Sequence, residues 1–377
     1  MIYLDNSATT RKKPFGVTAA LVYNSIANSI NAGRGSHRYS LKGAELLTSA
    51  ADSLASLFNI DEPERIAFTQ NATYALNLAI LGVLSDGGHA VVTSMEHNSV
   101  LRPVHRLGNY TMVWANDEGY VSPSDIEAAI KLDTRLIICT HASNVCGSIQ
   151  PVREIGELAR RHNVLFLVDA AQSAGILAIE VKDMNIALLA FSGHKGLMGP
   201  LGTGGLYVAK RAVLSPVITG GTGSASESLL QPDSLPDMLH AGTLNTPAIA
   251  ALGKAASTIQ RIGTENLLSH ERTLAGELFE RLDSIGGVTV QGSSDMSKRN
   301  GTVAFTIDGI SSTAAAELLD REFHIAVRGG WHCAYTAHKT LGSSEYGAVR
   351  ASFGRYNSMR DVTRLANAVN KIAQKTK

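Results

Sequence analysis

Short apolar runs alternate with longer amphipathic stretches between about residue 15 and residue 250. The runs have the length of buried strands, and several of the stretches between them repeat their apolar residues at helical spacing. The strand-like runs are RIAFT (65–69), AVVTS (90–94), RLIICT (135–140), VLFLVD (164–169), IALLAF (186–191) and GGLYV (204–208). This order predicts a mostly parallel sheet with helices on both faces, and site residues just beyond the carboxyl ends of its strands.

The pattern changes after about residue 250, where long helical stretches lead to shorter strand-like runs and further helices. Such an order predicts a smaller α+β unit. We therefore expect a large domain at residues 15–250 and a small domain formed by residues 1–14 and 251–377. A long helix could bridge the boundary near residue 250.

Composition and charge exclude several classes of protein. The 377 residues include 34 Lys and Arg against 33 Asp and Glu, so the formal net charge is +1. A nearly neutral chain has no electrostatic footprint for nucleic acid or for an acidic membrane surface. No apolar stretch approaches the roughly 20 residues that a membrane span needs. The 44% of hydrophobic residues instead predict a large globular core.

The cysteines and the first residues favour a cytoplasmic protein. Three cysteines cannot form a disulfide framework, and no CxxC pair suggests a structural metal site. The opening MIYLDNSATTRKKP has no charged start followed by an apolar run, so we expect no signal peptide.

Lys195 and Asp169 each follow or end a strand-like run. A lysine in the turn FSGHKGLMGP has what a Schiff base requires, a compact amine at a strand end that can lose its proton when desolvated. Asp169 in VDAAQS can pair with a pyridinium nitrogen and so keep a ring electron-poor. Taken singly, Lys195 also fits a residue that caps a loop, and Asp169 fits a helix N-cap.

Two further features join this pair. His97 follows the AVVTS run and can lie flat against a ring, although alone it fits an ordinary loop histidine. The segment TQNATYALN opens a helix directly after a strand, so the backbone N–H groups near Ala72 and Thr73 form a phosphate site. An amine, a carboxylate, a stacking ring and a phosphate site together predict one ligand, pyridoxal 5′-phosphate.

Motifs along nearly the whole chain resemble the class V aminotransferase-related family, and within it the cysteine desulfurases and selenocysteine lyases. The motifs are YLDNSATT with Pro14, NAGRGSH (31–37), TQNAT, MEHNS, THASNVCG, VDAAQS, SGHKGLMGP, AGTLNTP, RGGWHCA and VRASFGRYN. The resemblance implies an α/β fold of the aspartate-aminotransferase type, with a mostly parallel seven-stranded sheet in the large domain. It also implies a homodimer and pyridoxal phosphate bound covalently to Lys195.

The same resemblance assigns roles within these motifs. It implies that Lys195 carries the cofactor, that Asp169 contacts the pyridine nitrogen, and that His97 stacks on the ring and shuttles protons. It implies that Arg350 clamps the substrate carboxylate, for which its planar bidentate group is suited. The remaining implied contacts are Gln172 to the phenolate oxygen, Asn144 to the substrate and the cofactor edge, Ala72, Thr73, Ser192 and His194 to the phosphate, and Thr243 to the phosphate of the other subunit.

Cys333 in WHCA stands at the position of the sulfur-accepting cysteine of that family. It follows Gly329 and Gly330 and precedes a polar stretch, which predicts a mobile loop where a thiolate is exposed and activated. Cys139, inside a strand-like run, is expected to be an inert core residue, and Cys146 to fill space near the site.

Some positions depart from the family pattern. The Ala72-Thr73 pair offers one side-chain phosphate ligand fewer than a Thr-Thr pair. Met238 and His240 stand where relatives commonly carry Arg and Glu, which affects the expected polar network of the dimer interface. Trp331 stands two residues before Cys333, where many relatives have a smaller or more polar residue.

These residues and the resemblance predict a cysteine desulfurase that converts L-cysteine to L-alanine. Sulfur would pass to Cys333 as a persulfide and then to an acceptor protein for iron–sulfur cluster or thio-cofactor synthesis. The nearest alternative is a selenocysteine lyase acting on L-selenocysteine, followed by a pyridoxal-phosphate lyase or transaminase acting on another amino acid. The intact candidate residues argue against a non-catalytic scaffold. Because GPLGTGG (199–205) precedes a strand rather than a helix, a dinucleotide-binding oxidoreductase is also disfavoured.

Overall fold

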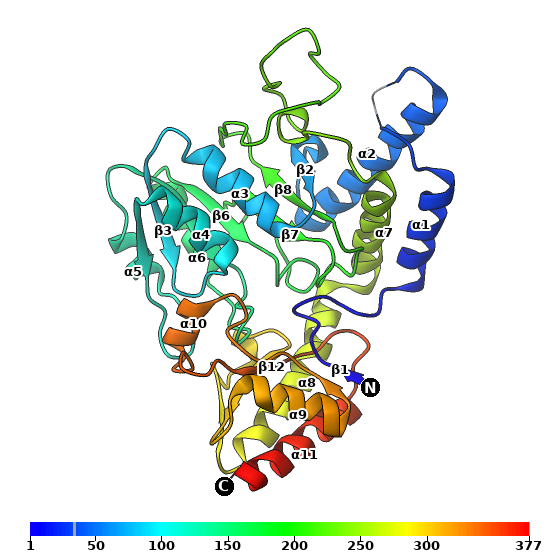
Figure 1. Cartoon of the computed structure of the whole chain (residues 1–377). Helices are drawn as coiled ribbons and strands as arrows, with labels where there is room; N and C mark the ends of the chain where they lie inside the picture. Colours follow the sequence, from blue (N-terminus) through cyan, green and yellow to red (C-terminus); the bar gives the residue numbers. More distant parts are fainter. Residues whose placement is uncertain (33–34, 377) are drawn as a thin grey trace.

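A seven-stranded sheet forms the centre of the larger part of the molecule (Figure 1). In this computed structural model, which describes residues 1–32 and 35–376, the strand order is β2-β8-β7-β6-β5-β3-β4. The strands are β2 (Ile66–Thr69), β3 (His89–Thr93), β4 (Tyr110–Val113), β5 (Thr134–Thr140), β6 (Leu165–Asp169), β7 (Leu188–Ser192) and β8 (Gly204–Val208). Neighbours from β7 to β4 are parallel, and β8 is antiparallel to β7 and β2. The predicted α/β class with a mostly parallel seven-stranded sheet is confirmed.

Each face of this sheet has its own apolar core, because alternate residues of a strand point to opposite sides. On β5, Ile137 and Cys139 pack into one cluster, whereas Leu136 and Ile138 pack into the other. The first face is covered by α2 (Arg38–Phe58), α5 (Pro123–Ala128), α6 (Val152–Arg161) and α7 (Thr246–Ile262). The second face is covered by α3 (Ala72–Val83) and α4 (Asn98–Leu107), and α1 (Phe15–Ala27) packs on α7. Coverage on both sides explains why the central strands are nearly continuous apolar runs.

Strand β4 is the one strand of this sheet that the apolar pattern did not predict. It lies at the edge of the sheet, and Tyr110, Thr111 and Met112 are only half-buried. A short edge strand does not need the continuous apolar run that marks the buried strands.

A smaller unit is built from the N-terminal residues and the last third of the chain. Strands β9 (Val288–Val290), β10 (Thr302–Ile307) and β12 (Val349–Ser352) form an antiparallel sheet, and β1 (Ile2–Tyr3) pairs with β11 (Ile325–Ala326). Its helices are α8 (Thr264–Asp283), α9 (Ser312–Phe323) and α11 (Met359–Thr376), whereas α10 (Tyr335–Thr340) packs through Ala337 into the first core of the large sheet. Short 3₁₀ helices span Pro63–Arg65, Asp237–Leu239 and Met296–Lys298.

The helical stretch after residue 250 is two helices, not one. Gly263 separates α7 from α8 with a φ of 85°, a conformation that glycine adopts readily. Residue 250 itself lies inside α7. The division into domains 15–250 and 1–14 with 251–377 stays a prediction.

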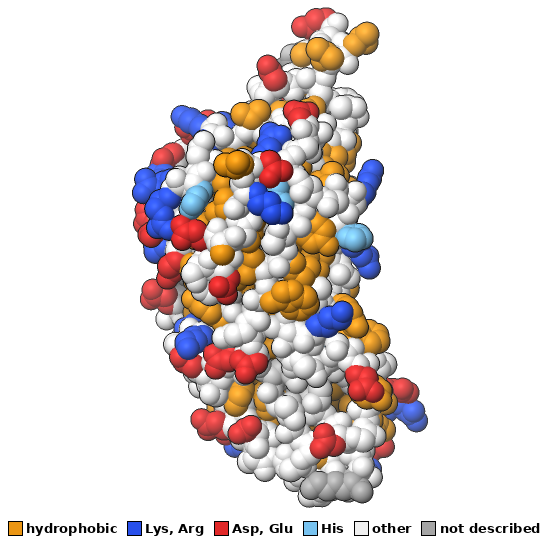
Figure 2. All heavy atoms as spheres, turned by 90° about the vertical axis from the view of Figure 1, so that its left-hand side faces the viewer, with side chains coloured by type: hydrophobic (Ala, Val, Ile, Leu, Met, Phe, Trp, Pro, Cys, Tyr) orange, Lys and Arg blue, Asp and Glu red, His pale blue; other side chains and the backbone are white. Residues whose placement is uncertain are grey.

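The charged side chains on one face of the molecule show no segregation by sign (Figure 2). Figure 2 shows acidic and basic side chains interspersed over the viewed face, rather than gathered by sign. Among the described residues, no helix is both long enough and apolar enough to span a membrane. The Gly33 and Arg34 of the NAGRGSH motif lie outside the described residues.

Candidate active site

Lys195 and Asp169 come from neighbouring parallel strands that end at the same edge of the sheet. Asp169 is the last residue of β6, and Lys195 lies in the turn after β7. Burial lowers the pKa of Lys195 to about 8, and the charge of Asp169 opposes that shift. Burial raises the pKa of Asp169, while the N–H of Ala171, 2.9 Å from Oδ1, and the charge of Lys195 act in the other direction. The two groups therefore form an electrostatically coupled amine–carboxylate pair.

His97 caps the start of α4 and is held in one protonation form. Its Nδ1 accepts a hydrogen bond from the N–H of Ser99 at 3.0 Å, so the neutral ring carries its proton on Nε2. Burial, followed by the charges of Lys195 and Arg328, lowers the pKa of His97 to about 4. The ring is therefore uncharged near neutral pH, which suits contact with another aromatic ring.

The start of α3 meets the end of β7. The hydroxyl of Ser192 accepts a hydrogen bond from the N–H of Ala72 at 3.1 Å, and the hydroxyls of Thr73 and Ser99 are 2.8 Å apart. His194 follows Ser192, and its Nδ1 is buried with no partner within the described ranges. A helix N-terminus, hydroxyl groups and an unsatisfied ring nitrogen form a group that fits a phosphate.

Gln172 and Asn144 connect this group to two other segments. The side-chain amide of Gln172 donates to the carbonyl of Ser7 at 3.0 Å. The side-chain amide of Asn144, which is buried, donates to the carbonyl of His332 at 2.7 Å. Two segments are thus attached to the edge of the large sheet: the N-terminal segment, and the loop at residues 328–334 that contains Cys333, which we call the cysteine loop.

Arg350 lies on β12 and is deeply buried, with 1% of its surface exposed. Its guanidinium donates to the carboxylate of Asp5 at 2.6 Å and to the carbonyl of Asn144 at 2.8 Å. The Nε of Arg350 has no partner in the described part of the chain. Its neighbour Arg328 pairs with it through backbone hydrogen bonds in both directions. Two cationic side chains therefore start from adjacent positions at the inner side of the cysteine loop.

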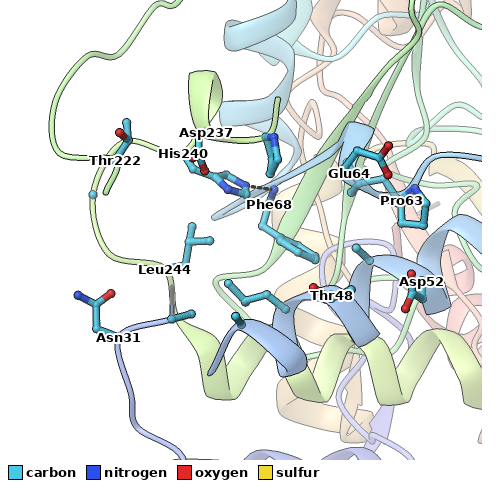
Figure 3. A pocket seen from close by; sticks show the side chains of 17 residues that line it. Asn31, Thr48, Asp52, Pro63, Glu64, Phe68, Thr222, Asp237, His240 and Leu244 are labelled. Atoms are coloured by element: carbon cyan, nitrogen blue, oxygen red, sulfur yellow. Dashed lines mark hydrogen bonds between the residues drawn. The ribbon is translucent and has the colours of Figure 1, made fainter. Parts of the chain in front are cut away.

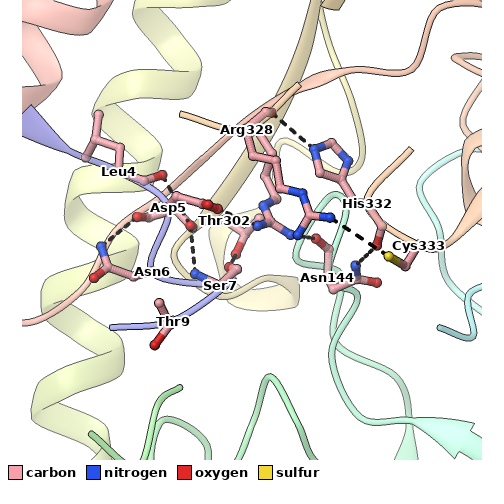
Figure 4. Close-up of polar contacts among 12 residues, drawn as sticks. Leu4, Asp5, Asn6, Ser7, Thr9, Asn144, Thr302, Arg328, His332 and Cys333 are labelled. Atoms are coloured by element: carbon pink, nitrogen blue, oxygen red, sulfur yellow. Dashed lines mark hydrogen bonds and ion pairs between the residues drawn. The ribbon is translucent and has the colours of Figure 1, made fainter. Parts of the chain in front are cut away.

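Cys333 lies on an exposed loop whose backbone is fixed by neighbouring segments (Figure 4). His332 and Cys333 have φ values of 50° and 58°, which are uncommon for residues with a side chain. The N–H of Asn98 at the start of α4 donates to the carbonyl of Cys333 at 2.7 Å. Arg328 extends its Nη2 to 3.9 Å from the Sγ of Cys333. The thiol is therefore exposed and next to a cation, close to His97.

Two buried histidines, His332 and His338, form a chain of hydrogen bonds that holds the loop around Cys333. The Nε2 of His332 donates to the carbonyl of Arg328 at 3.2 Å, because a carbonyl can only accept. The Nδ1 of His332 must then accept from the Nε2 of His338 at 3.2 Å, and the Nδ1 of His338 accepts from the hydroxyl of Ser343 at 2.8 Å. Burial lowers the pKa of His332 to about 2 and that of His338 to about 4, so both rings are neutral.

The two other cysteines are buried, and two of the departures from the family pattern, Met238 and His240, pack at the large sheet. Cys139 and Cys146 are both buried, and the thiol of Cys146 lies 3.4 Å from the hydroxyl of Ser148. Met238 packs into the core, and His240 accepts a hydrogen bond from the N–H of Phe68 on edge strand β2 at 2.7 Å.

Two more predicted positions are exposed. Thr243 lies between Gly242 and Leu244, which line a separate hollow (Figure 3). No hydrogen bond within residues 1–32 and 35–376 connects Thr243 to Lys195. Trp331 is 47% exposed, and its indole N–H donates to the carbonyl of Ser344 at 2.9 Å.

Four residues near the site were not predicted from the sequence to have a role: Asp5, Lys13, Glu96 and Arg328. Glu96 is fully buried, accepts from the hydroxyl of Thr93 at 2.6 Å, and burial raises its pKa to about 8. Lys13 donates to the carbonyl of His194 at 2.9 Å, and burial lowers its pKa to about 8. Three of these four residues lie within motifs that indicated the family: Glu96 in MEHNS, Asp5 in YLDNSATT and Arg328 in RGGWHCA.

Comparisons with known proteins agree with this geometry. The family model described as Aminotransferase class-V matches residues 2–365. A probable cysteine desulfurase of Methanothermobacter thermautotrophicus is 34% identical over 99% of this chain and 94% of its own length. The cysteine desulfurase of Haloferax volcanii is 31% identical over 98% of this chain and 89% of its own length.

Solved structures agree as well. The apo cysteine desulfurase of Thermococcus onnurineus has a TM-score of 0.93 and 34% identity, covering 99% of this chain and 95% of that one. The cysteine desulfurase CsdA of Escherichia coli has a TM-score of 0.88 and 26% identity, covering 99% of this chain and 94% of that one. The chain therefore belongs to the class V aminotransferase family, and the relatives to which it is similar include these cysteine desulfurases.

Proposed function

We propose that this protein is a cysteine desulfurase, which converts L-cysteine to L-alanine and receives the sulfur on Cys333. The observation that carries the proposal is the placement of this thiol. Cys333 is the exposed one of the three cysteines, and its Sγ lies 3.9 Å from Arg328. Burial lowers the pKa of Lys195 to about 8, and a thiolate at Cys333 would oppose this shift, so the two groups are close enough to interact. The names of the relatives support the same activity.

The cofactor that we propose is pyridoxal 5′-phosphate, and the residues present fit it. Lys195 offers an amine whose pKa is lowered to about 8, and Asp169 offers a buried carboxylate beside it. The Nδ1 of His194, which has no hydrogen-bond partner among the described residues, and the start of α3 fit the phosphate. When bound, the cofactor supplies an aldehyde for Lys195 and a ring that withdraws electrons from the α-carbon of the substrate. Gln172 and Asn144 are proposed to contact the ring edge, and Thr243 the phosphate of the partner subunit.

Arg350 and Arg328 are proposed to orient the substrate through its carboxylate. The buried Nε of Arg350 has no partner among the residues that the structure describes, while Asp5 and the carbonyl of Asn144 hold its other nitrogens in place. Arg328 extends from the adjacent backbone position toward Cys333. A carboxylate bound here would bring the side chain of L-cysteine toward the thiol of Cys333.

The proton and sulfur steps are assigned to three side chains. Lys195 Nζ takes the proton from the α-carbon, since its lowered pKa leaves a useful fraction of neutral amine. The thiolate of Cys333 attacks the sulfur of the substrate, and a sulfur–sulfur bond forms on Cys333 while the bond from sulfur to the β-carbon breaks. The electron pair of that broken bond stays on the substrate, and the β-carbon takes up a proton to become the methyl group of alanine. His97, whose Nε2 carries a proton, is positioned to donate it within the site.

We further propose an isologous dimer in the cytoplasm. The helix α1 exposes the apolar side chains of Phe15, Tyr23 and Ile26, and exposed apolar patches commonly mark protein–protein interfaces. A hollow of about 390 Å³ is lined by Gly242 and Leu244, on either side of Thr243 (Figure 3). The three cysteines are free, which suits a reducing compartment. The persulfide sulfur would pass to an acceptor for iron–sulfur cluster or thio-cofactor synthesis.

A selenocysteine lyase is the second candidate, because the same residues would hold either amino acid. Product analysis separates the two. The purified protein, loaded with pyridoxal phosphate, should be yellow and form alanine from L-cysteine in the presence of a reductant. Alanine from L-selenocysteine alone would favour the lyase, and a colourless protein that takes up no cofactor would refute both.

A further inference from the structure

A groove runs between the outer faces of α3 and α4 and reaches Cys333. Its volume is about 460 Å³, of which the part at Thr73 and His97 belongs to the proposed cofactor site and the part along α4 lies outside it. Lining residues come from one face of each helix and from the cysteine loop: Thr73, Asn77, Leu81, His97, Asn98, Ser99, Arg102, Pro103, Arg106 and Cys333. One end of the groove thus lies at the thiol and the stacking histidine, and the other end extends along α4.

The groove is positively charged. Arg102 and Arg106 lie one helical turn apart on α4, and both are exposed. Neither makes an ion pair or a side-chain hydrogen bond with any residue that the structure describes, and no lining residue is acidic. The charge of Arg102 is felt at the inner end, because it adds to burial, Lys195 and Arg328 in lowering the pKa of His97. Two unpaired cations on an open groove favour an anionic ligand.

The thiol of Cys333, at one end of the groove, indicates which kind of anionic ligand the groove would bind. Cys333 is exposed, whereas Cys139 and Cys146 are buried, so one thiol of the chain faces the groove. Under the proposed function, this thiol carries the outer sulfur of a persulfide once alanine has left. The next reactant must be a nucleophile that takes that sulfur.

We propose that the groove binds a low-molecular-weight thiol that bears carboxylates, with the carboxylates at Arg102 and Arg106 and the sulfur at Cys333. This proposal rests on the proposed function. The thiolate of the ligand attacks the outer sulfur of the persulfide, and a new sulfur–sulfur bond forms. The bond to Sγ of Cys333 breaks, and its electron pair remains on Sγ as a thiolate. The ligand leaves as its own persulfide, so no further oxidant or reductant takes part.

The first test needs no persulfide. Cys333 of the cofactor-loaded protein is allowed to react with 5,5′-dithiobis(2-nitrobenzoate), which carries two carboxylates, and with uncharged dithiodipyridine. In the variant R102Q/R106Q, the ratio of the anionic to the neutral rate constant should fall about threefold to tenfold at low salt, and less at high salt. The control variant R160Q/R364Q removes two exposed arginines from α6 and α11 and should keep the ratio of the unaltered protein.

A second test uses sulfur release. Enzyme treated once with L-cysteine is mixed with mercaptosuccinate, 2-mercaptoethanol or cysteamine, and the removal of sulfur from Cys333 is followed by mass spectrometry. Mercaptosuccinate should be the fastest of the three after correction for intrinsic thiol reactivity, and R102Q/R106Q should remove that advantage.

The two tests fail in distinguishable ways. An unchanged ratio of disulfide rates in R102Q/R106Q overturns the groove proposal, whatever the enzyme does with L-cysteine. Sulfur removal that is no faster with mercaptosuccinate than with 2-mercaptoethanol or cysteamine also overturns it. A charge-dependent ratio without any persulfide instead overturns the proposed function and leaves an anion-binding groove.

Discussion

Lys195 and Cys333 belong to one site, but the fold holds them by different means. Lys195 follows a buried parallel strand, and its position is set by the sheet and the two cores around it. Cys333 lies in an exposed loop, held by the N–H of Asn98, by Asn144 through the carbonyl of His332, and by the histidine pair. The amine is thus part of the rigid scaffold, whereas the thiol depends on a few polar contacts. We therefore expect substitutions of Lys195 and of Cys333 to impair the protein in different ways.

Loss of the amine should have the largest effect. Lys195→Ala removes both the group that bonds the cofactor and the base for the α-proton. Activity on L-cysteine should fall by more than about a thousandfold, since a positioned acid–base group alone contributes roughly 10²–10⁴-fold. The variant should release its cofactor on denaturation without any covalent adduct, measured by absorbance and intact mass. Substantial alanine formation by this variant would contradict the role of Lys195.

Loss of the thiol should instead separate two substrates. Cys333→Ser should nearly eliminate alanine formation from L-cysteine, because carbon–sulfur cleavage needs a nucleophile that takes the sulfur. Much of the activity on L-selenocysteine should remain, since selenium leaves more readily. The loss should appear in kcat more than in KM, because Arg350 and the cofactor would hold the substrate. Cys146→Ser, at a buried thiol, is the matched control and should retain activity on both substrates.

The pH dependence of cofactor uptake tests the coupling of Lys195 with Asp169. Only the neutral amine reacts with an aldehyde, so the uptake rate of the apoprotein should rise with pH and level off above about 8, where the pKa of Lys195 lies. Asp169→Asn removes the charge that opposes the shift, so the midpoint should move to lower pH by roughly one unit or more. A midpoint near the ordinary lysine value in both proteins would show that the amine is not buried.

The histidine pair gives the smallest expected effect. His338→Ala leaves the Nδ1 of His332 without its donor, which should cost about 1–3 kcal/mol of stability. We expect a lower kcat and slower alkylation of Cys333 with unchanged cofactor absorbance, because the cysteine loop is disturbed and the sheet is not. His338→Gln, which can keep a donor, should recover part of both, and His105→Ala on the exposed side of α4 should change neither. Equal alkylation rates in all three variants would contradict a positioning role.

The same contrast explains what the sequence could predict. The apolar runs VLFLVD, which ends at Asp169, and IALLAF, which ends just before Ser192, identified the carboxyl edge of the sheet, because buried parallel strands need both faces apolar. Lys195 and His97 followed from their places next to such runs. These positions depend on local pattern, so one sequence suffices to find them.

Contacts between distant segments were not predictable in this way. The ion pair of Arg350 with Asp5 joins the two ends of the chain, and no periodicity links them. The hydrogen bond between Asn98 and Cys333 and the chain of His338, His332 and Arg328 depend on how the small unit meets the large sheet. Only the resemblance of motifs indicated that these segments meet.

The most direct measurement is the location of sulfur after a single turnover. The cofactor-loaded protein is mixed with less than one equivalent of L-cysteine without reductant, so that no free thiol remains to remove the sulfur, and is then alkylated at once, digested and examined by mass spectrometry. The account predicts one added sulfur atom on the peptide that contains Cys333, with alanine formed in equal amount and no added sulfur on Cys139 or Cys146. Alanine formed in full while Cys333 carries no sulfur would contradict the account.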